Sequence, residues 1–144
     1  MLSRNMAITI ARLILKNKFL WMPLLVPIPV LFVWPTLFLR LEAMALLIPV
    51  TLFLHEWLHV MLASSSCGQT AIVCDSIRIA VRLDRSIPPG RALLAALLPP
   101  LVISVSGILI TLFDTLLGLP FLLHVFSIPC DLYGWLAGVM HESA

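Results

Sequence analysis

Four long apolar stretches take up most of this 144-residue chain. They run over residues 19–39, 43–64, 92–113 and 116–140, and each is long enough to cross a lipid bilayer as a helix. Only 11% of the residues are charged, whereas a soluble domain carries about 25%. Backbone polar groups in lipid have to be satisfied within their own segment, so the spans are expected to be helices. The sequence therefore predicts one membrane-embedded domain over residues 1–144, all-α and polytopic, with about four transmembrane helices.

Prolines and charges suggest where these spans are irregular. Arg40 and Glu42 are expected to form a polar turn between the first two spans, and Asp114 is expected to be a solvated turn residue after the third. Proline removes a backbone donor, so the first span should be bent or partly unwound and the third should be kinked at its middle. The prolines concerned are Pro23, Pro27, Pro29 and Pro35 in the first span and Pro99 and Pro100 in the third.

The basic residues gather in two places, a juxtamembrane segment over residues 1–18 and an extramembrane loop over residues 65–91. Four spans place both of these segments and the C-terminus on one side, which the excess of Lys and Arg marks as cytoplasmic. A net charge of only +2, distributed in this way, favours membrane orientation and not nucleic-acid binding. The residues are Arg4, Arg12, Lys16 and Lys18 in the first segment and Arg78, Arg82, Arg85 and Arg91 in the second.

Within the 65–91 loop, apolar and polar residues alternate from Ile77 to Asp84, which is the period of an amphipathic strand. We expect a small β-hairpin between the second and third helices, with residues 71–74 as the partner strand. An exposed edge there could bind an extended peptide by strand addition. The alternative is a hairpin that lies on the membrane with its arginines on lipid phosphates.

The second span carries the sequence H-E-W-L-H. On a helix His55 and His59 share one face, so two imidazole nitrogens can bind one metal ion while Glu56 reaches a water molecule at that metal. An ionisable residue within the membrane costs about 2.5 to 3.5 kcal/mol, so three within five positions indicate a functional site. The alternative is a helix whose polar side chains are satisfied by its neighbours.

A catalytic zinc ion takes three protein ligands, so a third residue is required. Asp131 lies roughly 22 Å into its span, within the interval of about 18 to 24 Å estimated for the two histidines. His124 lies about 10 Å shallower, so we expect it to support a ligand, pack against a helix or contact a substrate. The alternative for Asp131 is a carboxyl group paired with a neighbouring donor.

These motifs resemble the site-2 protease class of intramembrane zinc metalloproteases, and they look most like its small bacterial zincin peptidases. The resemblance runs from about residue 48 to 138, through H-E-W-L-H, the strand-rich loop, A-L-L-P-P and S-I-P-C-D-L-Y-G. It implies a Zn²⁺ ion held by His55, His59 and Asp131, with Glu56 as the general base. It also implies a membrane-anchored or membrane-inserting peptide or protein as substrate, and location in the bacterial cytoplasmic membrane with both termini cytoplasmic.

Two other classes of function compete with this reading. A non-catalytic zinc-binding membrane adaptor or immunity protein would be favoured by a fourth ligand, from Cys130 or His124, because structural zinc sites are usually closed. An ion transporter would spread its polar residues along a pathway, whereas here they are concentrated at two places. Four short spans bury little surface, so a homodimer or a partner protein beside the lipid bilayer is a further expectation.

Overall fold

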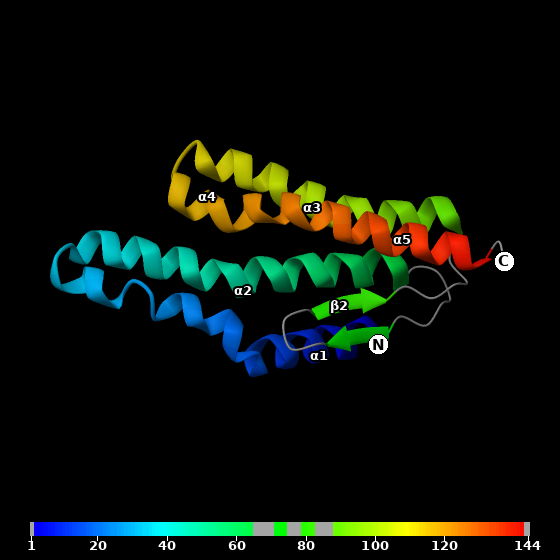
Figure 1. Ribbon diagram of the computed structural model, residues 1–144, viewed down its shortest axis with the longest axis horizontal. Coiled ribbons are helices and arrows are strands. Elements are labelled where there is room, and N and C mark those ends of the chain that lie inside the picture. Colours follow the sequence, from blue (N-terminus) through cyan, green and yellow to red (C-terminus); the bar gives the residue numbers. More distant parts are fainter. Residues whose placement is uncertain (1, 65–70, 75–78, 83–87, 143–144) are drawn as a thin grey trace.

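A computed structural model describes residues 2–64, 71–74, 79–82 and 88–142, and it is built mainly of helices (Figure 1). The chain begins with α1 (Leu2–Lys16) and two 3₁₀ helices, η1 (Lys18–Leu24) and η2 (Ile28–Phe32). The long helix α2 (Pro35–Ser64) follows, and then the strands β1 (Ala71–Cys74) and β2 (Ile79–Arg82). The last part consists of α3 (Pro89–Thr111), α4 (Thr115–Leu122), the 3₁₀ helix η3 (Leu123–Ser127) and α5 (Ile128–Glu142).

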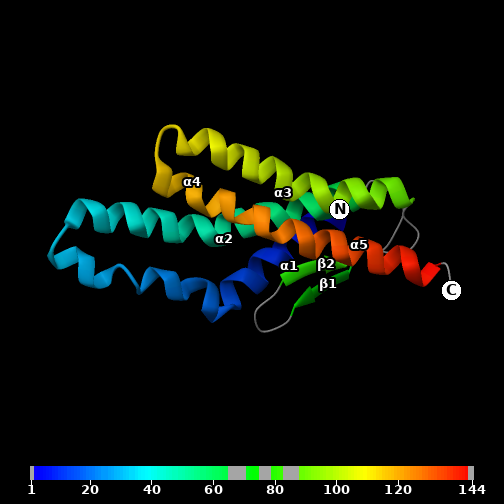
Figure 2. The same ribbon diagram turned by 45° about the horizontal axis from the view of Figure 1, so that its top comes forward.

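Helix α2 is the central element of the molecule. It contacts α3 and α4 on one side and α1, η1 and η2 on the other (Figures 1 and 2). Helix α3 runs back along α2, and the segment from α4 to α5 returns beside them (Figure 1). The histidine motif therefore lies on the helix with the most neighbours.

Three helical segments are long and apolar enough to cross a membrane: Pro35–Leu62, Gly90–Thr111 and Thr115–Leu136. The segments Asn5–Lys16 and Lys18–Phe32 pass the same test only as a pair, and they are bent by 60° relative to each other. A fourth crossing thus depends on that bent pair acting as one span. The described residues give three continuous candidates, fewer than the four expected.

The first expected span does not run as one helix over residues 19–39, in line with the expectation that its prolines leave it bent or partly unwound. Its prolines divide it into η1 and η2, because each proline lacks the N–H that an α-helix would use. Pro35 instead begins α2, where a missing N–H is tolerated. Helix α2 then continues through Arg40 and Glu42, so the expected turn at these two residues is wrong: no glycine or proline follows there to end the helix.

Helix α1, which covers most of the basic segment 1–18, packs against α2 near the histidine motif. Ile10 and Ile14 are buried with Val60 in one apolar cluster. The strands β1 and β2 pair antiparallel, with Ala71 opposite Arg82 and Cys74 opposite Ile79. Residues 65–70, 75–78 and 83–87 of the loop, including both ends of the strand expected from Ile77 to Asp84, lie outside the described residues.

Helices α3 and α4 approach each other closely through glycines. A Cβ atom on Gly107 would lie 2.8 Å from the backbone nitrogen of Leu122, and one on Gly118 would lie 2.8 Å from the carbonyl oxygen of Gly107. Small residues permit such close contact between membrane helices, which gain little from the hydrophobic effect when they associate in lipid. Helix α3 also continues through Pro99 and Pro100 without interruption.

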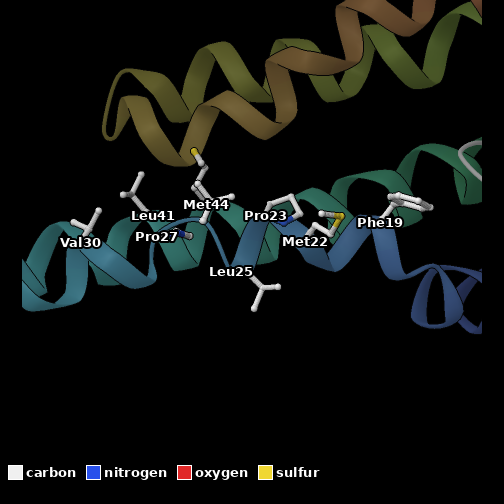
Figure 3. Close-up of a pocket in the computed structure, with 9 residues that line it drawn as sticks. Phe19, Met22, Pro23, Leu25, Pro27, Val30, Leu41 and Met44 are labelled. Atoms are coloured by element: carbon white, nitrogen blue, oxygen red, sulfur yellow. The ribbon is translucent and has the colours of Figure 1, made fainter.

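An apolar groove of about 570 Å³ lies between η1, η2 and α2 (Figure 3). Its lining is almost entirely apolar and consists of Phe19, Met22, Pro23, Leu25, Val26, Pro27, Val30, Leu41 and Met44. Met44 precedes His55 by eleven residues on α2, which corresponds to about 16 Å along the helix. The groove is therefore separate from the histidine motif.

Candidate metal centre

The structure brings together the three side chains predicted as metal ligands, although they come from two distant parts of the chain. One ligand atom from each of His55, His59 and Asp131 lies within 4.8 Å of the other two, so the group could hold a metal ion. The two histidine Nε2 atoms are 2.9 Å apart. The Asp131 carboxylate lies 3.5 Å from Nε2 of His55 and 3.9 Å from Nε2 of His59.

These separations fit a small tetrahedral cation. Zinc binds imidazole nitrogen and carboxylate oxygen at about 2.0 to 2.2 Å, so neighbouring ligand atoms around it are about 3.3 Å apart. The two imidazole nitrogens are 2.9 Å apart, and the carboxylate reaches them through different oxygens, with Oδ2 3.5 Å from His55 and Oδ1 3.9 Å from His59. Two imidazoles and one carboxylate also form the donor set of many catalytic zinc sites.

Burial makes the arrangement costly unless the polar atoms are satisfied. His55 and His59 are only 3% and 6% exposed. Among the described residues, the buried Oδ2 atom of Asp131 has no hydrogen-bond partner. A buried acceptor without a partner costs about 1 to 3 kcal/mol, and more when it is charged. A cation between the carboxylate and the imidazoles would remove that cost.

His59 is oriented by a backbone carbonyl that sequence reasoning missed. Its Nδ1 atom lies 2.7 Å from the carbonyl oxygen of Ala95 on α3, which leaves Nε2 directed at His55. Ala95 is four residues before Pro99, and Pro99 has no N–H to donate to that carbonyl. The proline therefore frees an acceptor for His59. In the sequence, the only signal of this free carbonyl is Pro99, four residues after Ala95.

Asp131 lies in a span that is not a continuous α-helix. The expected helix over residues 116–140 is divided into α4, η3 and α5, and Asp131 lies in the first turn of α5. Pro129, in the same turn, is tolerated there because the first N–H groups of a helix have no intrahelical partner. The positive end of the helix dipole at this turn favours a carboxylate.

Glu56 and His124 complete the surroundings of the three ligand candidates. Glu56 follows His55 on α2 and is 5% exposed. The His124 ring is stacked on that of His55, with ring centroids 4.9 Å apart. The expectation that His124 supports a ligand or packs against a helix agrees with this contact, whereas the depth estimate, which counted backbone rise alone, placed it too far away.

Asp114 is not part of this site. It begins α4 by accepting hydrogen bonds from the backbone N–H groups of Leu116 and Leu117, and it forms an ion pair with Arg40 at 2.7 Å. Asp114 lies in the turn after α3 as expected, and its roles as helix cap and ion-pair partner were not predicted. Continuation of α2 through Arg40 is what brings the guanidinium group to it.

No protein-family model, no curated protein and no solved structure matches this chain.

Proposed function

We propose that this chain is an intramembrane zinc metalloprotease that cleaves membrane-anchored or membrane-inserting peptides. The observation that supports this most is the convergence of Asp131 on His55 and His59 beside a buried glutamate. A structural zinc site would usually have four protein ligands. Among the described residues the mutually close group contains three, which favours the open site of a catalyst over the adaptor alternative.

Each residue has a distinct part in the proposed reaction. His55, His59 and Asp131 would hold the zinc ion, which when bound supplies a Lewis acid and lowers the pKa of water to about 7. Glu56 would take the proton of the attacking water and pass it to the leaving amine. The hydrogen bond between His59 and Ala95 fixes which nitrogen of His59 is available to the metal.

The proposal extends to topology and location. We place the bent pair Asn5–Lys16 and Lys18–Phe32 across the membrane as a fourth crossing, which puts both termini and the 65–91 loop on the cytoplasmic side of a bacterial inner membrane. The basic residues in the terminal segment and in the loop support this orientation. The paired strands β1 and β2 would lie at the same membrane face and could hold a substrate in extended form.

Two substitutions test the chemistry. In proteoliposomes with a single-span peptide substrate, Glu56→Gln should retain zinc and lower the cleavage rate by about 10²-fold or more, because it removes the general base. Asp131→Ala should lose the metal, as measured by elemental analysis of the purified protein. Glu42→Gln is the matched control, since it changes a glutamate on the same helix outside the site, and it should leave zinc and cleavage unchanged. A Glu56→Gln protein that still cleaved at the wild-type rate would rule out this mechanism.

A further inference from the structure

His124 lies against His55 without belonging to the group of three candidate ligands. The two rings are inclined by only 19°, so they are stacked. His59 meets His55 differently: those centroids are 4.6 Å apart and the planes are inclined by 69°. His55 thus has His124 over one face of its ring and His59 at an edge.

The two histidines of the H-E-W-L-H motif are held in different ways. His59 has the carbonyl of Ala95 as partner for its Nδ1 atom. The Nδ1 atom of His55 has no hydrogen-bond partner among the described residues, although this side chain is only 3% exposed. Metal-binding histidines almost always donate their second N–H, and loss of that partner typically costs 10- to 100-fold in metal affinity. Among the described residues, the His55 ring therefore lacks the support that the Ala95 carbonyl gives to His59.

We infer that His124 is a positioning residue that orients His55 by ring stacking. The stacked ring restricts rotation of the His55 imidazole, so its Nε2 atom stays directed at His59 and Asp131. Stacked flat rings with centroids about 4.5 to 7 Å apart attract each other beyond the area that they bury. This inference rests on the proposed metal site. It gives His124 a role that does not require it to bind the metal.

The 3₁₀ helix η3 changes the rotation of His124 relative to Asp131. In a continuous α-helix, residues seven apart lie on nearly the same face, one about 10 Å above the other. A 3₁₀ helix turns about 20° further per residue and rises more steeply. Through η3, His124 is rotated relative to Asp131, so one side chain meets the face of the His55 ring and the other its Nε2 edge. Ser127 stabilises the turn by donating a hydrogen bond to the carbonyl oxygen of His124 at 2.9 Å.

Titration of the full-length protein with Co²⁺ in detergent micelles tests the inference without any substrate. The variants are His124→Phe, which retains a flat ring without nitrogen, His124→Leu, which has no ring, and His124→Gln, which keeps a polar nitrogen but no ring. The control is His141→Leu, ten residues beyond Asp131 on α5. Circular dichroism establishes that all variants retain the helical content of the wild type before they are compared.

His124→Leu and His124→Gln should both bind Co²⁺ about tenfold more weakly and show altered visible absorption bands, because the ligand His55 is no longer held. His124→Phe and His141→Leu should retain the affinity and bands of the wild type. Wild-type affinity in His124→Leu would overturn the inference. So would a loss in His124→Phe as large as in His124→Leu, because that result would make the nitrogen a ligand.

A wild type that binds no Co²⁺ would overturn both this inference and the metal site, whereas one that binds Co²⁺ but cleaves no peptide would refute only the protease.

Discussion

Pro99 and His59 lie on different helices and are connected through the carbonyl oxygen of Ala95. The proline leaves this carbonyl without its usual helical donor, and His59 approaches it to 2.7 Å. Pro99 and Pro100 are both fully buried in α3, yet only the first stands four residues after Ala95. Pro99 therefore frees the Ala95 carbonyl for His59, whereas the adjacent Pro100 does not.

Pro99→Ala should weaken zinc binding at the proposed metal site. The new backbone N–H would compete with Nδ1 of His59 for the Ala95 carbonyl, and disturbance of such supporting hydrogen bonds typically costs 10- to 100-fold in metal affinity. Pro100→Ala is the matched control, since it removes a buried proline of equal size but restores a donor to Ala96 instead. Competition for zinc with a chromophoric chelator measures the zinc affinity of both variants. Equal affinities of the two variants would contradict the role assigned to Ala95.

At the scale of single residues, the sequence predicts that His55, His59 and Asp131 lie close together, as they do. The spacing of His55 and His59 fixes them to one helix face, and equal depth selects Asp131. The stacking of His124 and the role of Ala95 could not be derived in the same way. Both contacts depend on how each helix is rotated about its own axis relative to its neighbours. A count of residues along a span gives depth only and does not give this rotation.

The helical elements follow the apolar stretches, but their ends follow proline and hydrogen-bond chemistry. Helix α3 agrees closely with the expected third span, because Pro89 starts it and the apolar run ends near Thr111. Helix α2 begins at Pro35, well before the expected start at residue 43, because two charged side chains are not enough to end a helix. The expected irregularity of the first span takes the form of η1 and η2, whereas α3 continues through Pro99 and Pro100, and the break at η3 was not predicted.

Gly107→Ala should destabilise the contact between α3 and α4. The added methyl group would lie 2.8 Å from the backbone nitrogen of Leu122 and 2.8 Å from Cβ of Phe121, so the helices would have to separate. Overpacking of this kind typically costs about 1 to 3 kcal/mol in free energy of unfolding. Thermal unfolding in detergent should show a lower melting temperature.

Gly134→Ala is the matched control for this substitution, because a Cβ atom at Gly134 on α5 would meet nothing within 4 Å. Alanine is favoured over glycine in a helix by about 1 kcal/mol, so this variant should melt at the wild-type temperature or above it. Equal melting temperatures for Gly107→Ala and Gly134→Ala would show that α3 and α4 are not closely packed at Gly107.

In the molecule as a whole, the ion pair between Arg40 and Asp114 joins the beginnings of α2 and α4 at 2.7 Å. The hydrogen bond from Arg40 holds the pKa of Asp114 below its ordinary value. A carboxyl group whose pKa is lowered by folding stabilises the fold above the pKa of its unfolded state, and this contribution is lost as the pH falls through the lower, folded pKa.

Asp114→Asn should therefore lower the melting temperature slightly at pH 7, and the difference from the wild type should vanish in strong acid. Asparagine still caps α4, so the change isolates the ion pair from the cap. Melting temperatures of both proteins in detergent, measured from pH 7 downwards, give the comparison. A difference that persisted unchanged at low pH would assign the effect to the cap and not to the charge.

Topology gives a prediction for the complete chain. If the bent pair Asn5–Lys16 and Lys18–Phe32 crosses the membrane, a green fluorescent protein fused to either terminus should fold in the cytoplasm and fluoresce. Fluorescence from only one of the two fusions would leave three crossings and place the termini on opposite sides. The test does not depend on zinc or on proteolysis.

The position of His59 along α2 determines how deep the metal-binding cluster lies in the membrane. His59 follows Arg40 by nineteen residues on this helix, a distance of about 28 Å, while the hydrocarbon core of a bilayer is about 30 Å thick. If the Arg40–Asp114 pair marks one boundary of the hydrocarbon, the cluster of imidazoles stands close to the opposite boundary, on the side of the loop. Under the proposed function and topology, hydrolytic water would then need to descend only a few ångströms from the cytosol, and the scissile bond of a substrate would lie at the rim of the bilayer and not at its midplane.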